Sequence, residues 1–578
     1  MPKYPNINDD NFYDRINKIY KKYKVPKKIQ TMENICMPKT FKLQLPQQFL
    51  ADFMSPKTDY KGILVYHRIG AGKTCTAVRI AEEWKKHKRI IIVLPASLKG
   101  NFRTELRSLC ADNNYLKPIE RKELSKLHPN DKRYKEIMTE SDKRIDKYYE
   151  IYSYNKFVES VNNKSLHLKN ALLIVDEIQN MVSEDGTFYE SLYNIIHKSS
   201  NDLRIVLLSA TPMFDKPNEL ALTINLLRTK NHMPIGKEFN STFIQTIKKS
   251  NDTFDHKVIN LELLKQYIKG YVSFFRGAPP HVFPKVTIKF IKCHMSDFQV
   301  SAYAKILRNE EKEFDDKIVL RDVLKDLNIS DLPNYFYIGT RMVSNIVYPN
   351  KKLGNQGLLS LTKSKILKNL EQYSVKFFEI LNRIEHMTGK IFVYSAFKEF
   401  GGIKPFIKIL EAYGYKDYTT EGQGKKRFAV LSGDESINIK ERIKTVFNMK
   451  DNLSGKYLKI IIGSPATKEG ISFYGVRQVH ILEPYWNRSR LDQIIGRASR
   501  FCSHKDLSEE KRTVKVYIYL AVHDDLEQTI DQYMQQLIMQ KSKIINSFET
   551  AIKESAIDCY LNQNANVDVD AEPINCDI

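Results

Sequence analysis

The sequence has no long apolar run. A typical one, Ile90–Leu94, has five residues, whereas a membrane-spanning helix needs about 20. The first ten residues, MPKYPNINDD, lack the apolar core that a secretory signal has. We therefore expect neither a transmembrane helix nor a signal peptide, and we expect no membrane among the partners.

Cysteine is scarce, with seven residues in a chain of 578, and no two of them form a Cys-x-x-Cys pair. A small, odd and scattered set argues against a zinc site and against a disulfide framework, and it favours a reducing compartment. The 13 histidines show no His-Glu-x-x-His motif, so a metal site built from histidines is not expected either.

Acidic residues are outnumbered. The chain has 91 Lys and Arg against 68 Asp and Glu, a net charge of +23 at pH 7. One interpretation is a polyanionic partner, because clustered cations neutralise phosphates and release counterions. The other is a general compositional bias, since Lys, Ile, Asn and Tyr are all abundant. Charge alone leaves both interpretations open.

Short apolar runs alternate with helical stretches, which is typical of parallel sheets covered by helices. The runs form two groups separated by a proline-rich segment at 277–284. We therefore predict an α/β fold with two lobes in tandem. The predicted strands are 62–66, 89–94, 171–175 and 204–208 in the first group, and 390–394, 427–431, 459–463, 478–482 and 514–520 in the second.

The pattern predicts four regions. Residues 1–40 form a basic N-terminal extension, 41–272 the first lobe, and 273–525 the second lobe with a helical insertion at about 300–385. Residues 526–578 form a helical extension and an acidic tail. From 557 onward there are five acidic residues and no Lys or Arg, so we expect this end of the chain to be loose.

The strongest local motif is the run Gly70-Ala71-Gly72-Lys73-Thr74, between a predicted strand and a predicted helix. Glycines let backbone amides wrap a phosphate, and the N-terminus of the helix adds its positive dipole end. We expect Lys73 to reach the terminal phosphates of a nucleotide and Thr74 to bind Mg²⁺.

A second motif, Asp176-Glu177, ends the predicted strand 171–175. A carboxylate at the carboxyl end of a strand suits a Mg²⁺ ligand, and its neighbour can orient and deprotonate water. We assign Asp176 to the metal and Glu177 to the water. A third motif, Ser209-Ala-Thr-Pro212, follows the next strand and indicates a link from this site to the rest of the lobe.

A fourth motif lies in the second lobe, where Arg497 and Arg500 are three residues apart on one predicted helix face. Guanidinium groups suit phosphate oxygens and the charge of a transition state. We therefore predict that these arginines act on the nucleotide held by the first lobe. Gln493 belongs to the same motif and is assigned with them to catalysis.

These motifs, in this order on two lobes, resemble helicase superfamily 2. The resemblance implies two RecA-like lobes, with ATP and Mg²⁺ bound between them. It also implies further site residues: Gln48 would read adenine and Gly470 would contact the nucleotide. The nucleic-acid backbone would be contacted by Pro95, Ser97, Asn101, Ser395 and Thr467.

Finer features, such as Phe283-Pro-Lys285 and Glu483-Pro-Tyr-Trp-Asn487, resemble the chromatin-remodelling branch, whose members move along duplex DNA. The motif from His67 to Thr74 and the tail from Lys553 to Cys559 are similar to the helicase-like ATPases of large cytoplasmic DNA viruses, which include poxvirus nucleoside triphosphatase I and the small subunit of the early transcription factor. This likeness implies a virion and host-cytoplasm location, in the viral factory, with the viral RNA polymerase or transcription factor subunits as partners. Duplex DNA is the favoured substrate and RNA a possible one.

Two positions depart from the superfamily pattern. His67 stands where the phosphate loop usually begins with glycine, and Gln179 replaces the His or Asp that usually follows the Asp-Glu pair. Two alternatives to a translocating ATPase stay open. One is a helicase that unwinds strands, and the other is a catalytically weak adaptor with a helicase fold, which these two departures favour.

Overall fold

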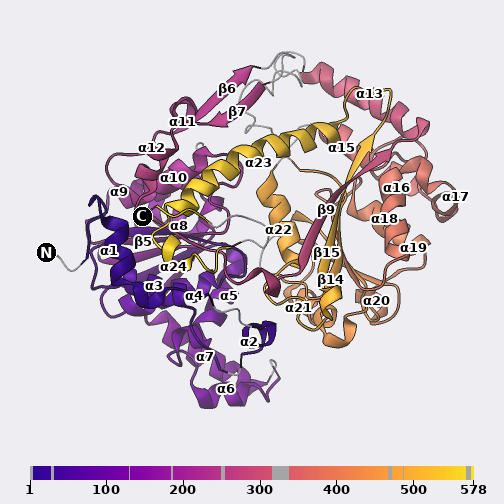
Figure 1. Cartoon of the computed structure of the whole chain (residues 1–578). Helices are drawn as coiled ribbons and strands as arrows, with labels where there is room; N and C mark the ends of the chain where they lie inside the picture. The colour runs from indigo at the N-terminus through magenta and orange to yellow at the C-terminus, as the bar shows by residue number, and fades with distance from the viewer. Residues whose placement is uncertain are drawn as a thin grey trace. The chain divides into compact units, whose positions relative to one another are not determined.

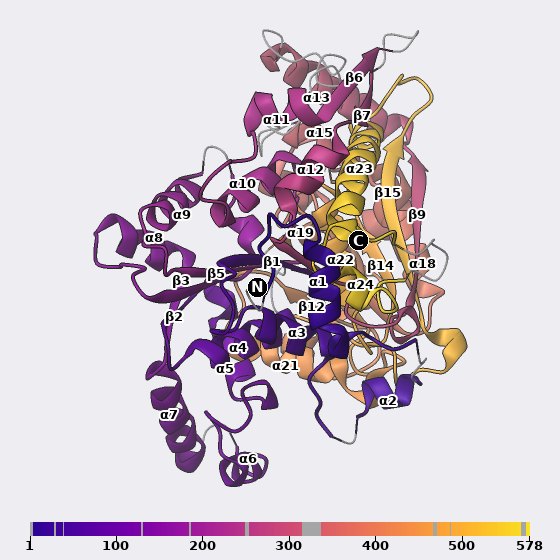
Figure 2. The same ribbon diagram turned by 60° about the vertical axis from the view of Figure 1, so that its left-hand side comes forward.

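The computed structural model describes residues 4–27, 31–38, 40–128, 131–183, 186–248, 254–314, 337–465, 471–485, 487–567 and 574–577. The chain divides into two compact units. Unit 1 comprises Met1–Thr246, His256–Pro280 and Ile544–Ile578, and unit 2 comprises Ile247–Asp255 and His281–Lys543. Figures 1 and 2 show both units as sheets with helices around them. In the described part of the chain, no helix is both long and apolar enough to span a membrane.

Unit 1 is built on a six-stranded parallel sheet with the strand order β3-β2-β4-β5-β1-β8. Every residue of β1 and β4 is buried, as expected for continuous apolar strands covered on both faces. The strands are β1 (Gly62–His67), β2 (Arg89–Leu94), β3 (Tyr149–Ser153), β4 (Ala171–Val175), β5 (Arg204–Ser209) and β8 (Val272–Phe275).

Helices cover this sheet and form its core with it. The helix that follows β1, α4 (Lys73–Trp84), buries seven of its residues, among them Val78 and Ile80. The other helices of unit 1 are α1 (Phe12–Ile19), α2 (Met32–Cys36), α3 (Leu45–Phe53), α5 (Lys99–Leu106), α6 (Pro118–Leu124), α7 (Lys132–Asp146), α8 (Tyr154–Asn162), α9 (Thr187–His197), α10 (Asn218–Leu227), α11 (Gly236–Phe243), α12 (Leu261–Ile268) and α24 (Cys559–Asn562).

Unit 2 has a seven-stranded parallel sheet with the order β11-β12-β13-β10-β14-β15-β9. Its strands are β9 (Lys285–His294), β10 (Lys390–Tyr394), β11 (Lys416–Asp417), β12 (Arg427–Leu431), β13 (Ile460–Gly463), β14 (Val476–Ile481) and β15 (Thr513–Val522). A separate pair, β6 (Ile244–Lys248) and β7 (Phe254–Val258), lies where the two units divide the chain.

The helices of unit 2 fall mostly between β9 and β10, and between the later strands. They are α13 (Asp297–Phe314), α15 (Ile338–Asn345), α16 (Gly354–Ser360), α17 (Lys363–Tyr373), α18 (Val375–Glu385), α19 (Ile403–Ala412), α20 (Tyr418–Glu421), α21 (Ile437–Asn448) and α22 (Arg488–Ala498). A long helix, α23 (Ile530–Glu554), begins in unit 2 and ends in unit 1.

The predicted α/β fold with parallel sheets is confirmed, but the units differ from the predicted regions. Residues 247–255, predicted in the first lobe, and 526–543, predicted in the C-terminal extension, belong to unit 2. Residues 273–280 were assigned to the second lobe, whereas β8 pairs with β1 and lies in unit 1. The expectation of a loose end after 557 is wrong for residues 557–567. Ile557 and Leu561 are 1% exposed and belong to the core of unit 1.

The cysteines also differ from expectation. Cys75 is disulfide-bonded to Cys110, and Cys559 to Cys576. The prediction that the chain carries no disulfides is therefore wrong. The pairs could not be read from spacing, because each joins elements that only the fold brings together. Among the described residues, Cys293 is a free and buried cysteine.

Candidate functional site

The phosphate loop lies between β1 and α4. Gly72 has a φ of 76° and immediately precedes the first helical residue, Lys73. This left-handed conformation favours glycine, and a Cβ at Gly72 would lie 2.6 Å from Nε2 of Gln47. Lys73 and Thr74 are the first two residues of α4, so the backbone N–H groups of the loop and of the first helical turn can bind an anion.

The predicted catalytic carboxylates follow β4 and lie close to this loop. Asp176 is 5% exposed, and its backbone N–H donates to the carbonyl of Val93. Glu177 has a φ of 51°, and its Oε1 lies 4.0 Å from Nζ of Lys73. Since β4, β5 and β1 are adjacent in the sheet, their carboxyl ends bring the lysine and the carboxylates to one edge, as predicted.

A chain of hydrogen bonds connects Glu177 to β5. Nε2 of Gln179 donates to Oε2 of Glu177 at 2.6 Å, and the hydroxyl of Ser209 donates to Oε1 of Gln179 at 2.7 Å. The carboxylate only accepts, which fixes the orientation of the Gln179 amide. The backbone N–H of Thr211 in turn donates to the Ser209 hydroxyl. Gln179, a departure from the superfamily pattern, thus links the carboxylate to the third motif.

Thr74 and Asp176 are the side chains that would hold Mg²⁺. They supply a hydroxyl and a carboxylate, which are the oxygen ligands that Mg²⁺ prefers, and Asp176 is buried at the edge of the sheet where the phosphate loop lies. The donor set fits the ion. When bound, Mg²⁺ would neutralise charge that develops on the phosphates.

Two neighbouring glutamines differ in what they contact. Gln48, predicted to read adenine, donates from Nε2 to the carbonyl of Leu43. Gln47 is the one that reaches the phosphate loop, where its Nε2 donates to the carbonyl of Gly72 at 3.3 Å. Sequence reasoning missed Gln47, and adenine recognition by Gln48 stays a prediction.

The residues predicted to contact nucleic acid fall in different surroundings. Ser97 and Asn101 are exposed, whereas Pro95 is buried. Ser395 is 3% exposed, and its hydroxyl donates to the buried carboxylate of Glu483 at 3.1 Å. The placement of Pro95 and Ser395 in the interior does not support a direct contact with nucleic acid. Thr467 and Gly470 lie outside the described residues.

Unit 2 carries the predicted arginines on and just after α22. Arg497 is 8% exposed and donates from Nη1 to the carbonyl of Ile471. Arg500 donates from Nε to the carbonyl of Gly496. These residues belong to unit 2 and Lys73 to unit 1, so the predicted meeting of lysine and arginines on one nucleotide stays a prediction.

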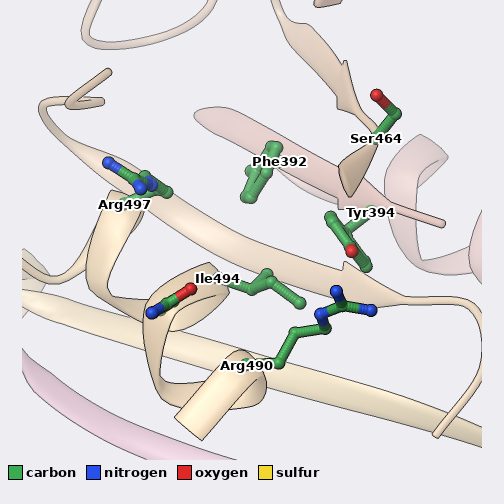
Figure 3. Close-up of a pocket in the computed structure, with 7 residues that line it drawn as sticks. Phe392, Tyr394, Ser464, Arg490, Ile494 and Arg497 are labelled. Carbon is green, nitrogen blue, oxygen red and sulfur yellow. The ribbon is translucent and has the colours of Figure 1, made fainter. Parts of the chain in front are cut away.

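A pocket in unit 2 adjoins α22, β10 and the end of β13. Figure 3 shows Arg490 extending toward Tyr394 at one end of the pocket, while Arg497 lies at the other end. The guanidinium of Arg490 lies 4.1 Å from the ring centre of Tyr485, a favourable cation–π contact. Sequence reasoning missed Arg490, although it stands seven residues before Arg497. The pocket is lined by Phe392, Tyr394, Ser464, Arg490, Gln493, Ile494 and Arg497.

Comparisons with known proteins agree with these motifs. Residues 44–334 match the SNF2-related domain, and residues 375–502 match the helicase conserved C-terminal domain. A solved structure of the Sulfolobus solfataricus SWI2/SNF2 ATPase core in complex with dsDNA aligns with 88% of this chain and 93% of that chain at 16% identity. Its TM-score of 0.29 is too low to support any argument.

Two viral relatives cover most of the chain. A protein of Acanthamoeba polyphaga mimivirus, named "Putative ATP-dependent RNA helicase R563", is 52% identical over 99% of both chains. An African swine fever virus protein, named "Termination factor NPH-I homolog", is 24% identical over 95% of this chain and 84% of its own length. Together with the SNF2-related match, these relatives show that the chain belongs to the superfamily 2 helicase-like ATPases of large DNA viruses.

Proposed function

We propose that this ATPase is a translocase on duplex DNA that works with a viral RNA polymerase, in the virion and in the host cytoplasm. The observation that carries the catalytic part is the hydrogen-bonded path from Glu177 through Gln179 to Ser209, beside Lys73. This path connects Glu177, the group that would act on water, with the third motif at Ser209, and such a connection is what a motor needs and a mere binding module does not.

Each residue would have a definite task in hydrolysis. Lys73 would bind the terminal phosphates, and Glu177 would orient water for in-line attack and accept its proton. Gln179 would hold the carboxylate in place. Arg497 and Arg500 would stabilise the charge of the transition state once the units close on the nucleotide.

The choice of DNA and of transcription rests on different support. The relative named a termination factor favours a role beside a polymerase, and the charge of +23 favours a nucleic-acid partner. Among the predicted contacts on unit 1, Ser97 and Asn101 are exposed at the surface. The relative named an RNA helicase favours RNA as the second candidate substrate.

The test is a steady-state ATPase assay with duplex DNA, single-stranded DNA and RNA as stimulators. We expect duplex DNA to give the largest increase in kcat, and Lys73→Ala to abolish turnover. Lys86→Ala, an exposed lysine just beyond α4, is the matched control and should behave like the wild type. Lys73→Ala with unchanged activity would refute the site, and the strongest stimulation by RNA would favour the helicase alternative.

Translocation and unwinding are separated by a second assay. A translocase displaces the third strand of a DNA triplex without opening a blunt duplex, whereas a helicase separates a tailed duplex. Nucleotide binding with no turnover at saturating DNA would favour the adaptor alternative.

A further inference from the structure

Residues 557–566, the end segment, run along the outer edge of β8. Strand β8 is the last strand of the sheet in unit 1, next to β1, and Figure 1 shows α24, in yellow, among the indigo and violet elements of this unit. The backbone N–H of Ile557 donates to the carbonyl of Val272 at 2.9 Å. Residues 557–566 thus take the place of a neighbouring strand.

Side chains of this segment satisfy the remaining backbone groups of the edge. Oδ1 of Asp558 accepts from the backbone N–H of Phe274 at 2.9 Å. The side-chain amides of Asn562 and Asn566 donate to the backbone carbonyl of Phe274 at 3.2 and 3.3 Å. Oδ1 of Asn566 also accepts from the backbone N–H of Arg276 at 2.9 Å. An exposed strand edge is usually protected by such cover.

A buried chain of polar groups leads from this segment to the phosphate loop. The hydroxyl of Ser273 donates to Oδ2 of Asp558 at 2.6 Å, and Nε2 of His67 lies 3.0 Å from the same hydroxyl. All three residues are 0% exposed. Since Ser273 donates to the carboxylate, its oxygen accepts the Nε2 proton of a neutral His67. His67 is the last residue of β1, where the phosphate loop usually begins with glycine.

An apolar contact runs beside this polar chain. Ala71 of the phosphate loop packs in a small buried cluster with Phe275 and with Ala565 of the end segment. Gly277 has a φ of 107°, and a Cβ there would lie 2.8 Å from the Cβ of Ala71. The residues after β8 therefore press directly on the loop, and the end segment holds them in place.

We propose that Asp558 is a positioning residue of the ATP site, which acts on the phosphate loop through Ser273 and His67. The hydrogen-bonded chain Asp558–Ser273–His67, which we call the strut, then connects the end segment to the residue that precedes the phosphate loop. This inference requires only that the protein binds ATP, and it does not depend on the nucleic-acid or polymerase partner.

The experiment measures KM and kcat for ATP, and the Kd of a fluorescent ATP analogue, in the full-length protein. We expect Asp558→Ala and Ser273→Ala each to raise KM and Kd about tenfold, with a smaller change in kcat, because the strut positions the loop and touches no reacting atom. Asp558→Asn keeps an acceptor for Phe274 and a partner for Ser273, so it should retain a KM within about twofold of the wild type.

Two comparisons make the result decisive. The double variant Asp558→Ala/Ser273→Ala should raise KM no further than either single variant, because both break one chain. Asp577→Asn is the matched control, since this carboxylate, later in the chain than the segment 557–566, contacts Lys265 and Ser555 instead of β8. The proposal would be overturned if KM for ATP were unchanged in the folded variants, or if the two single variants had additive effects on KM in the double variant. It would also be overturned if Asp577→Asn raised KM as much as Asp558→Ala does. If Asp558→Ala fails to fold, Ser273→Ala decides it alone.

Discussion

At the scale of single residues, Gln179 shows that a departure from a motif can make contacts of its own. The amide donates to Glu177 and accepts from Ser209, so it links the Asp-Glu pair to β5 from the position where the superfamily pattern has His or Asp. The sequence identified the position but not the contact, because the partner on β5 is 30 residues away and the geometry of a side chain is not encoded in a local pattern.

Gln179→Ala should lower the stimulated kcat about tenfold and leave KM for ATP within about twofold. The reason is that a hydrogen bond to a charged group is worth roughly 1.5–3 kcal/mol, and about 1.4 kcal/mol is one factor of ten. Steady-state kinetics with saturating nucleic acid measures both constants. Asn180→Ala, an exposed neighbour, is the control. A Gln179→Ala variant with unaltered kcat would show that the hydrogen bonds of Gln179 do not contribute to turnover.

A second prediction at this scale concerns pH. Burial raises the pKa of the Asp558 carboxyl from 3.8 to about 7, while burial, with a smaller contribution from Lys73, lowers the pKa of His67 to about 3. Asp558 is therefore the member of the strut that titrates near neutral pH. The stability from its protonated form is complete below pH 4 and is lost as the pH rises to 7, at a cost of about 4 kcal/mol.

Asp558→Asn removes this titration. The free energy of unfolding is measured in urea at a series of pH values. Between pH 4 and 7 it should rise in the variant relative to the wild type, because only the wild type loses stability by this titration. Above pH 7 the difference between the two proteins should be constant. Parallel pH profiles for the two proteins would contradict the assignment.

At the scale of elements, the strands differ in how well sequence predicts them. The continuous apolar strands β1, β2, β4 and β5 were predicted to within one residue. Strands β3 and β9 were missed, because they mix polar with apolar residues and lie at sheet edges. The four-residue β8 contains Ser273, which looks out of place in a core until its partner Asp558 is seen.

The disulfide between Cys75 and Cys110 ties the start of α4 to the segment after α5 across 35 residues. Chain entropy alone predicts a stabilisation of about 4 kcal/mol for a loop of this length. We expect Cys110→Ser to lower the midpoint of thermal unfolding under non-reducing conditions. A reductant should then shift the wild type by more than it shifts the variant, and equal shifts would show that this bond adds nothing.

At the scale of the whole molecule, the net charge of +23 has two interpretations that salt can separate. If lysines and arginines contact phosphates, the affinity for duplex DNA falls steeply with salt, with a logarithmic slope of about −0.9 for each phosphate neutralised. We expect at least a tenfold loss between 50 and 200 mM salt, as judged from the DNA concentration that half-maximally stimulates the ATPase. KM for ATP, measured in the same buffers, is the control. A flat dependence would indicate that the charge is compositional.

The cover on β8 also has a consequence for biosynthesis. The six strands of the sheet in unit 1 end at Phe275, whereas the cover on the edge of β8 comes from residues 557–566, so this edge stays open until that later segment has been synthesised. A nascent or prematurely terminated chain that stops before residue 557 would carry every phosphate-loop residue and still lack the segment that covers β8. We expect such a chain to bind ATP more weakly than one in which residues 557–566 cover β8, in the same direction as Asp558→Ala.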